Sequence, residues 1–500
     1  MSEDTLITGK EARKKLLKGV NKVANAVKNT LGANATTVII EQEDSFPLIL
    51  NDGVSIAQAV NDPDPYVQMG IDLIKQVATQ AQNSSGDGTT TATVIAQSLC
   101  NEGMDMISAG DDPVEVVDTL KADAEKIITA LKENSTECEA LANLIDVATI
   151  SANNDSELGS LIAEVMHEIG SEGAIAMKNG SSYETYYEIT EGLDIQAGSA
   201  SPYFTESINN ANVLISMDKI NTFESIVPAM EASLQEGRGL LIVCSDYNPA
   251  ILPNLLINVV QGKINATLVK MAGMKDTQWA WAEDIQAITG GEIHAKENGK
   301  SLEGDLSMGY ADTVVCKKDS CVIESKVNAV DSKIESLQEL MESAESSWDK
   351  QVYARRIARL QRGVASIIVG ADSEVELRER KERIDDAVNA VRAAQRNGII
   401  AGGGSLLYAL SKDSDNPLIV EAFTTPLNLI AAYCDVFVEP EMIDGEFNGI
   451  GYNAKTNEWC NMIEAGVIDP VDVVVNSIRS AISIATLVLL SEAMVALPRD

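Results

Sequence analysis

The sequence predicts a multidomain protein that combines mostly helical domains with an α/β domain. Two observations predict this class. The chain has 500 residues, which is enough for about three domains with separate cores. Its pattern also changes in an ordered way, from helical at both ends, through mixed, to alternating strands and helices in the middle. This order indicates nested domains in which the first and last segments form one unit.

The first 133 residues are predicted to be mostly helical, because apolar residues recur there three and four positions apart. Asp112-Pro113 supports this prediction, since it has the form of an N-cap followed by a first-turn proline. The predicted elements are a helix over 10–31, a β-hairpin over 37–50, a helix over about 65–83, a helix that ends at Ser108 and a helix that begins after Asp112.

The middle of the chain has a different pattern. Residues 134–186 are predicted to be helical and then to form a strand. Beyond Tyr186, strand-like runs such as Leu240–Cys244 and Ala266–Lys270 alternate with helices, which is typical of an α/β domain. The predicted order after these runs is a charged helical pair over 327–361, a strand and one long helix over 363–396, a glycine-rich turn over 401–404 and helices to the end.

The composition argues against several classes of function. A net charge of −37, from 38 basic and 75 acidic residues, is unfavourable for binding nucleic acid or an anionic membrane surface. We recognise no secretion leader and no apolar run of membrane-spanning length, so the expected location is the cytoplasm. Aromatic residues make up 4% of the chain, so the cores are expected to be aliphatic.

The cysteines argue against structural zinc. There are seven, scattered along the chain without a C-x-x-C pair, and only two histidines accompany them. We expect reduced thiols. Cys316 and Cys321 are nevertheless spaced so that they could face each other across a hairpin.

The run Gly86-Asp87-Gly88-Thr89-Thr90-Thr91 carries the clearest chemistry. Glycines let backbone N–H groups turn toward an anion, and the first turn of the following helix adds more such groups. Threonine hydroxyls can bond phosphate oxygens, and Asp87 can bind the divalent cation that neutralises them. The residues alone leave two interpretations open, a phosphate site and an ordinary turn with a helix cap, and the second is the commoner.

Further motifs occur in order and at compatible separations, and together they resemble the GroEL-type group I chaperonins over nearly the whole chain. The departures noted below are compatible with a divergent bacterial or phage-encoded copy. The matching stretches are Asn51–Ser55, Gly86–Thr91 with its helix, Ile150–Asp155, Ser201–Phe204, Asp386–Val388, Ala401–Gly404, Gly451–Ala454 and Asp469-Pro470.

The resemblance implies a chaperonin architecture of three domains. A mostly helical equatorial ATPase domain would comprise 1–133 and 397–500. A small intermediate hinge domain would comprise 134–186 and 362–396, and an α/β apical substrate-binding domain would span 187–361.

The resemblance also implies an ATP site in which Asp87 binds Mg²⁺ and Asp469 hydrogen-bonds the ribose, with K⁺ left open as an additional ion. The family usually has lysine where Asn51 stands and proline where Ala33 stands, so an altered affinity or rate is expected. The nucleotide-binding positions carried over are Thr30, Leu31, Gly32, Ala33, Asn51, Asp87, Gly88, Thr89, Thr90, Thr91, Gly403, Asn453, Ala454, Lys455 and Asp469.

Hydrolysis requires a water molecule aligned on the γ-phosphorus and an acceptor for its proton. Asp52 and Asp386 are the catalytic candidates that the resemblance implies. From the residues alone, Asp385 competes with Asp386, and either could be merely solvated. No Gly-x-x-x-x-Gly-Lys-Ser/Thr run occurs, which disfavours a P-loop ATPase.

A general chaperone needs an apolar surface with adaptable side chains. Periodicity alone favours a core role for several of the candidates, whereas the resemblance favours a surface that binds unfolded polypeptides. The implied substrate-binding residues are Tyr203, Phe204, Val227, Met230, Leu252, Leu256, Ile257 and Asn258.

The leading hypothesis is therefore an ATP-driven chaperone that assembles with itself into rings, and the resemblance implies heptamers in one or two rings. A lid-type co-chaperonin would use the apical surface, and Ala493–Leu497 could pair with the 37–50 hairpin of a neighbouring subunit. The alternatives are a hydrolysis-impaired holdase or scaffold with the same fold, and an unrelated ATP-dependent metabolic enzyme. The last lacks support, because no compact set of small-substrate groups stands out.

Overall fold

The structure, a computed structural model, consists of two compact units. The first unit comprises Met1–Glu164 together with Glu382–Asp500, and the second comprises Val165–Lys381. Both ends of the chain therefore lie in the first unit. The α plus α/β class is confirmed: the first unit is mostly helical and the second contains the larger sheets. The described residues are 6–33, 36–41, 48–50, 52–138, 140–170, 173–180, 183–190, 192–302, 306–318, 320–325, 330–344, 346–443 and 449–496.

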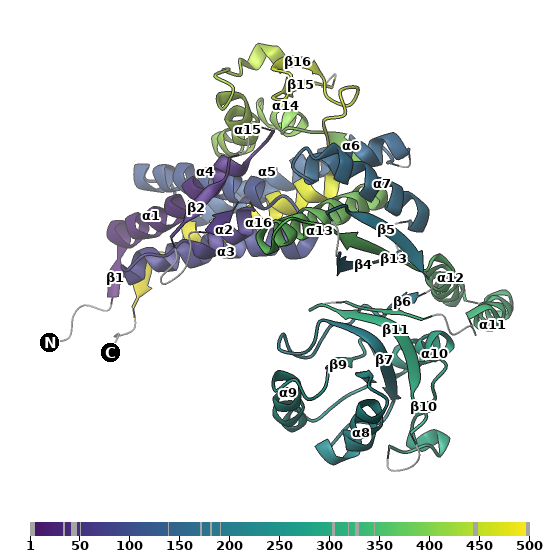
Figure 1. Ribbon diagram of the computed structural model, residues 1–500. Coiled ribbons are helices and arrows are strands. Elements are labelled where there is room, and N and C mark those ends of the chain that lie inside the picture. The colour runs from purple at the N-terminus through teal and green to yellow at the C-terminus, as the bar shows by residue number, and fades with distance from the viewer. Residues whose placement is uncertain are drawn as a thin grey trace. The chain divides into compact units, whose positions relative to one another are not determined.

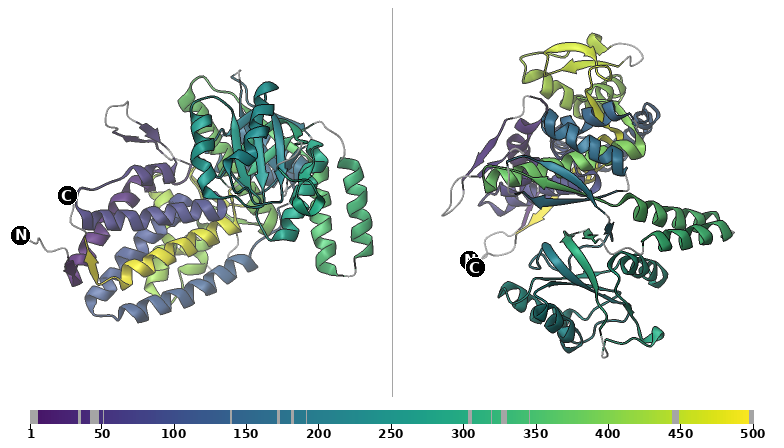
Figure 2. Two further views of the ribbon diagram at one scale, coloured as in Figure 1. Left: turned by 90° about the horizontal axis from the view of Figure 1, so that it is seen from below. Right: turned by 45° about the vertical axis from the view of Figure 1, so that its right-hand side comes forward.

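Long helices form the body of the first unit, and several run side by side (Figure 2, left). Aspartate caps begin two of them: Asp64 accepts a hydrogen bond from the N–H of Tyr66, and Asp112 accepts from Val114 and Glu115, each ahead of a first-turn proline. The core between the helices is almost wholly aliphatic, as the composition predicts. The helices are α1 (Gly9–Val27), α3 (Pro65–Ser85), α4 (Thr89–Ala109), α5 (Pro113–Glu133) and α16 (Val471–Leu490).

Helix α16 corrects the expectation that no apolar segment reaches membrane-spanning length. By length and composition it could cross a membrane. Most of it is buried, however, because it packs against α3, α4 and α5 in the core of the first unit. Such burial is typical of the central helix of a folded domain.

Four small antiparallel sheets belong to the described part of the first unit, and two of them concern the predicted hairpin and the C-terminal strand. The predicted hairpin is confirmed: β2 (Val38–Ile40) pairs with β3 (Leu48–Leu50). Strand β18 (Ala493–Val495) pairs with β1 (Leu6–Thr8) of the same chain, and pairing with the hairpin of a neighbouring subunit stays a prediction. The edge of β18 is thus partly satisfied inside its own subunit.

The remaining elements of the first unit are shorter. The sequence reading missed the strands after residue 397, because their short runs lie among helix-compatible residues and turns. These strands form the pairs β14–β17 and β15–β16. The elements are α2 (Gly53–Ala59), α6 (Leu141–Ser151), β14 (Ile399–Ala401), α14 (Ser405–Ser411), α15 (Pro417–Ala432), β15 (Ile450–Asn453), β16 (Glu458–Asn461), β17 (Ile468–Pro470) and the 3-10 turns Lys28–Thr30 and Pro440–Ile443. The chain passes from one unit to the other within two helices, α7 (Ser156–Ile169) and α13 (Glu374–Asn397).

A seven-stranded mixed sheet organises the second unit, in the order β6-β12-β11-β7-β8-β9 with β10 beside β7 (Figure 1). Strand β8 is buried along its whole length, as expected for a parallel strand covered on both faces. Separate apolar clusters lie on the two faces. The strands are β6 (Gly192–Asp194), β7 (Ser207–Ser216), β8 (Gly239–Cys244), β9 (Ala266–Lys270), β10 (Ile293–His294), β11 (Gly309–Cys316) and β12 (Cys321–Glu324).

Helices cover this sheet. Helices α8 (Val227–Gln235) and α9 (Leu252–Val260) contribute to the cluster around β8 and β9, and α10 (Lys275–Thr289) contributes to the other. The predicted charged helical pair is confirmed as α11 (Val330–Ser343) and α12 (Ser347–Arg362). Short 3-10 turns are formed by Phe223–Ile226, Pro249–Ile251 and Lys296–Asn298.

Cys316 and Cys321 face each other in register on β11 and β12, and a disulfide joins them. The expectation of reduced thiols was therefore wrong for this pair. The other cysteines are free.

A second, three-stranded sheet has the order β4-β13-β5, with β4 (Ala174–Asn179) parallel and β5 (Tyr186–Thr190) antiparallel to β13 (Val364–Val369). Strands β4 and β13 belong to the intermediate domain that the resemblance implies, whereas all of β5 after Tyr186 belongs to the implied apical domain. Glu324 at the end of β12 is buried and accepts hydrogen bonds from Lys178 and Ser366 of this sheet. The three-domain boundaries stay a prediction.

Candidate functional site

The Gly86–Thr91 loop lies between α3 and α4, and both of its glycines are required by its geometry. Gly86 and Gly88 have φ angles of 69° and 82°, in the left-handed region. A Cβ atom at Gly86 would lie 2.3 Å from the Asn389 side chain, and one at Gly88 would lie 2.4 Å from Oγ of Ser477. The loop is thus wrapped closely by α13 and α16.

Asp87 is held at both carboxylate oxygens. Its Oδ1 accepts the N–H of Gly88 over 2.5 Å, and its Oδ2 accepts the hydroxyl of Ser151 over 2.7 Å. Ser85 Oγ donates to the backbone carbonyl of Asp87 over 3.1 Å. Burial raises the pKa of Asp87, and the negative charge of Asp52 raises it further.

The three threonines form the first turn of α4, whose N-cap is Gly88. In this turn the backbone N–H groups have no partner inside the helix, so they can bind an anion. Oγ1 of Thr90 lies 2.8 Å from Oγ1 of Thr30, which brings these two predicted residues together. A Cβ atom at Gly53 would lie 2.8 Å from the Thr90 hydroxyl, so the start of α2 packs against this turn.

Asp52 is the N-cap of α2. Its carboxylate accepts the N–H groups of Val54 and Ser55 over 3.2 and 2.7 Å. These bonds fix the carboxylate next to the positive end of the short helix. Asn51 lies outside the described residues.

Asp386 lies on α13, and its Oδ1 accepts a hydrogen bond from Gln82 over 3.3 Å. Burial raises the pKa of Asp386 well above its usual value, and the charges of Asp87, Asp52 and Asp385 raise it further. The two catalytic candidates and the predicted metal ligand therefore act on one another electrostatically.

Asp469 lies on β17 and accepts the N–H of Gly403. Burial, with the charge of Asp87, raises its pKa to about 6. Gly403 has a φ of 63°, and a Cβ atom at Gly402 would lie 3.0 Å from the Asp469 carboxyl group. The second glycine-rich turn thus packs directly on Asp469.

The other predicted nucleotide residues occupy the surroundings of this group. Leu31 and Ala454 are buried in one apolar cluster, and Gly32 packs against Ile430 of α15. Asn453 is buried and accepts the backbone N–H of Lys455 over 3.0 Å. Ala33 and the Lys455 side chain are exposed.

Within the described residues, no ion pair involves Asp52, Asp87, Asp386 or Asp469. Negative charges that raise the pKa of the neighbouring carboxyls of Asp87, Asp386 and Asp469, with no protein cation among the described residues paired to these three, favour a bound cation. In that same part of the chain, no three His, Cys, Asp or Glu residues converge to hold a metal. Mg²⁺ nevertheless fits, because it commonly takes one or two carboxylates and completes its shell with phosphate oxygens and water.

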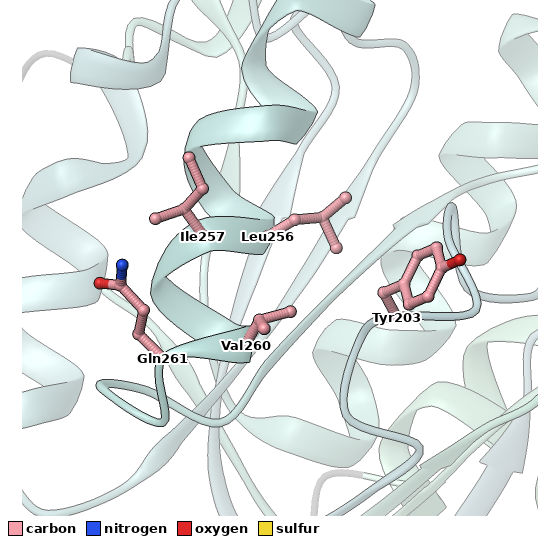
Figure 3. A pocket seen from close by; sticks show the side chains of 5 residues that line it. All are labelled: Tyr203, Leu256, Ile257, Val260 and Gln261. Carbon is pink, nitrogen blue, oxygen red and sulfur yellow. The ribbon is translucent and has the colours of Figure 1, made fainter.

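The second unit carries an apolar hollow of about 260 Å³ beside α9. Figure 3 shows Leu256 and Val260 pointing from the helix toward Tyr203. Tyr203, Ile257 and Val260 are 72%, 52% and 71% exposed. These exposed side chains lie together along one hollow, so they form a small apolar surface in contact with water.

The structure separates the predicted substrate-binding residues into three groups. Tyr203, Leu256 and Ile257 line the hollow. Leu252 and Asn258 on α9 and Val227 on α8 are half-buried and do not line it. Phe204 and Met230 are a correction: both are buried in the core cluster around β8, so neither is presented at the surface.

The sequence reading missed three residues. Val260 and Gln261 line the hollow, and helical spacing from Leu256 and Ile257 could have indicated them. Ser151 contacts Asp87 although it lies 64 positions away. It stood inside the motif Ile150–Asp155, but nothing local in the sequence pairs it with Asp87.

Comparison with known proteins relates this geometry to one family. The model of the TCP-1/cpn60 chaperonin family matches residues 23–236 and 265–415. The fold is similar to that of chaperonin gp146 from bacteriophage EL 2 (Pseudomonas aeruginosa), crystallised in the presence of ATP-BeFx: in crystal form II the TM-score is 0.72 at 19% identity, covering 99% of each chain. In crystal form I of that chaperonin the TM-score is 0.66 at 19% identity, covering 100% of each chain.

Proposed function

This chain belongs to the TCP-1/cpn60 chaperonin family, and we propose that it is an ATP-dependent, ring-forming chaperone that captures non-native polypeptides and promotes their folding through ATP-driven domain movement. The observation that carries the proposal is the set of carboxylates, without a partner cation among the described residues, around the first turn of α4. Such a site suits a phosphate chain together with a divalent cation.

In this proposal the nucleotide phosphates lie against the Gly86–Thr91 loop. The N–H groups of the first turn of α4 and the hydroxyls of Thr89 and Thr90 donate to the phosphate oxygens. Asp87 binds Mg²⁺, which when bound neutralises phosphate charge during transfer. Asp469, fixed by the Gly403 N–H, accepts hydrogen bonds from the ribose hydroxyls.

Asp386 and Asp52 orient the attacking water and accept its proton. The raised pKa of Asp386 suits a proton acceptor, because it makes this carboxylate a stronger base than an ordinary aspartate. Asp52 is ill-suited to move, since two N–H groups fix its carboxylate, and this favours a positioning role.

Chain connectivity supports a link between hydrolysis and domain movement. Asp386 lies on α13, a continuous helix whose first turns belong to the second unit and whose last turns belong to the first. A change at the nucleotide can therefore bias the position of the second unit through one helix.

The apolar hollow beside α9 is the proposed capture surface. Ile257 and Val260 expose aliphatic side chains beside Tyr203, and such a surface binds apolar segments without reading their sequence. Homo-oligomeric rings, heptameric in this proposal by family resemblance, would present many copies and so raise avidity. A lid-type co-chaperonin remains a proposed partner at the same surface.

A hydrolysis-impaired holdase or scaffold is the second candidate. The observation that favours it is Asn51, which stands where the resembling family usually has a lysine. A neutral amide supplies no positive charge to the phosphates, so binding without turnover is the expected behaviour in this alternative.

Purified full-length protein distinguishes the two candidates. If the leading proposal is correct, this protein releases phosphate steadily from MgATP. Electron microscopy should then show rings in which the domain positions differ with and without ATP. Rings that bind ATP without phosphate release would favour the holdase. A monomer that leaves nucleotide unbound would overturn both.

A further inference from the structure

The hydroxyl of Ser151 reaches Asp87 from a distant part of the chain. Ser151 is the last residue of α6, and its Oγ donates to Oδ2 of Asp87 over 2.7 Å. The only other hydrogen bond to this carboxylate within the described residues comes to Oδ1, from the adjacent Gly88 N–H. The two bonds arrive at opposite oxygens, so together they fix the plane of the carboxylate.

The end of α6 is itself held in an unusual way. Asn153 and Asn154, which follow it, have φ angles of 62° and 64°. Consecutive left-handed residues that are not glycine carry a conformational cost, and they persist where surrounding contacts determine the backbone. Backbone bonds from Asn153 to Ile150 and from Asn154 to Thr149 close this turn directly around Ser151.

The arrangement leaves Asp87 able to bind a cation. An ionised carboxylate has about four acceptor positions, two on each oxygen. Ser151 and Gly88 each occupy one, which leaves one free on each oxygen. Groups that hold a metal ligand in this way orient it without competing with the metal.

We propose that Ser151 is a positioning residue for the divalent cation, and that its hydroxyl holds the Asp87 carboxylate in the orientation that binds Mg²⁺ beside the nucleotide phosphates. The proposal rests on the proposed function, because it takes Asp87 as the Mg²⁺ ligand. Ser151 does not touch the nucleotide in this assignment. Its loss should therefore weaken the response to Mg²⁺ and leave metal-free nucleotide binding unchanged.

The test uses the full-length protein and a fluorescent ATP analogue, bound either in EDTA or during a titration with Mg²⁺. For Ser151→Ala we expect the half-saturating Mg²⁺ concentration to rise about 10-fold or more, as for other groups that orient a metal ligand. Affinity in EDTA should stay within about 2-fold of the wild type, because phosphate contacts to backbone N–H groups remain. Ser151→Thr keeps a hydroxyl and should stay close to the wild type.

Two controls make the result specific. Ser160→Ala removes a hydroxyl that donates only to the Ser156 carbonyl of its own helix, and it should change neither measurement. Asp87→Asn should abolish the Mg²⁺ dependence. The thermal unfolding midpoint of each variant without nucleotide shows whether the fold is retained.

The outcomes distinguish a failure of the positioning role of Ser151 from a failure of the proposed function. Ser151→Ala with a wild-type Mg²⁺ response overturns the positioning role and leaves the ATP site intact. Equal losses with and without Mg²⁺, or equal changes in the Ala and Thr variants, would also overturn it, since they indicate a structural role. A wild-type protein that binds no nucleotide in either condition would overturn the proposed function itself.

Discussion

Gln82 Nε2 donates a hydrogen bond to Oδ1 of Asp386 over 3.3 Å, and the two residues are 304 positions apart in the chain. Gln82 lies in the last turns of α3, just before the glycine loop, so the bond ties Asp386 to the start of that loop. Asp386 is also close enough to Asp87 and Asp52 for their charges to raise its pKa. The proposed catalytic carboxylate thus lies among other acidic side chains.

Replacing this carboxylate should separate binding from hydrolysis. Asp386→Asn keeps the shape and can still bond Gln82, but an amide does not accept the proton of the attacking water. We expect phosphate release to fall by about 10²–10⁴-fold, the usual contribution of a general base. Steady-state phosphate release measures this loss, and equilibrium binding of ATP should be retained.

The same substitution should stabilise the protein without nucleotide. Removing one negative charge relieves its repulsion with Asp87 and its own cost of burial. We expect the free energy of unfolding to rise by about 1 kcal/mol, observed as a higher thermal midpoint. Asp385→Asn is the matched control for position. A normal rate in Asp386→Asn with a reduced rate in Asp385→Asn would reassign the catalytic role to Asp385.

The raised pKa of Asp469 predicts a pH dependence of nucleotide binding. Burial holds this pKa at about 6 in the absence of nucleotide, so the carboxyl becomes protonated as the pH falls from 7 to 5. A protonated carboxyl is a weaker acceptor for ribose hydroxyls, so affinity for ATP should decline over this range. Isothermal titration at several pH values measures the effect, and Asp469→Asn should flatten the curve between pH 5 and 7. A wild-type curve as flat as that of the variant would contradict the assignment.

The pH dependence of stability should run in the opposite direction to that of nucleotide binding. Because the folded state binds this proton more tightly than the unfolded state, Asp469 favours folding most at low pH, and this advantage is lost as the pH rises through about 6. Asp87 and Asp386 have pKa values raised in the same direction. In the nucleotide-free protein, their joint contribution to the free energy of unfolding should therefore increase as the pH is lowered from 7 toward 5.

Polypeptide capture should depend on the exposed residues beside α9. Ile257→Ser and Val260→Ser remove apolar side chains that are 52% and 71% exposed, and each should weaken binding of an unfolded polypeptide with little loss of stability. Met230→Ala is the contrasting variant, because Met230 is buried in the core cluster. It should lower the free energy of unfolding by about 2–4 kcal/mol. Suppression of aggregation of a denatured protein measures capture.

Unimpaired capture by the Ile257→Ser, Val260→Ser double variant would contradict the assignment of this surface. Lys263→Ser on the following loop is a control, since it changes an exposed side chain outside the hollow.

Much of the fold follows from local patterns in the sequence. Helices α3 and α5 begin at aspartate caps followed by proline, and the sequence predicts the cap of α5 at Asp112. Helix α3 ends at Ser85, close to the predicted end at residue 83. The glycine loop was found because its chemistry is contiguous. Strand pairs such as β14 with β17 were not predicted, since residues 399–401 and 468–470 are short and their pairing is long-range.

The site shows the same division. Thr90 and Asp87 stand in one motif, whereas the contacts of Asp87 with Ser151 and of Asp386 with Gln82 depend on how distant segments pack. Met230 was predicted to lie on the binding surface, but it is buried in the core cluster. Helical spacing alone does not distinguish an apolar residue that faces the core from one on the neighbouring, exposed face.

The buried ion pair between Arg356 and Asp284 should anchor the α11–α12 pair to the rest of the second unit. Arg356 on α12 donates to both oxygens of Asp284 on α10, over 3.1 and 2.6 Å, and to the carbonyl of Ala280 over 3.2 Å. Asp284 is 1% exposed, so losing Arg356 leaves a buried carboxylate without the cation that hydrogen-bonds it. Arg356→Met should therefore lower the free energy of unfolding by about 3–5 kcal/mol.

The double variant Arg356→Met, Asp284→Leu removes both charges and should recover most of the loss. Denaturant unfolding followed by tryptophan fluorescence suits the measurement, because Trp281 lies on α10 one turn from Asp284. A double variant no more stable than the single one would show that the two side chains act through separate contacts.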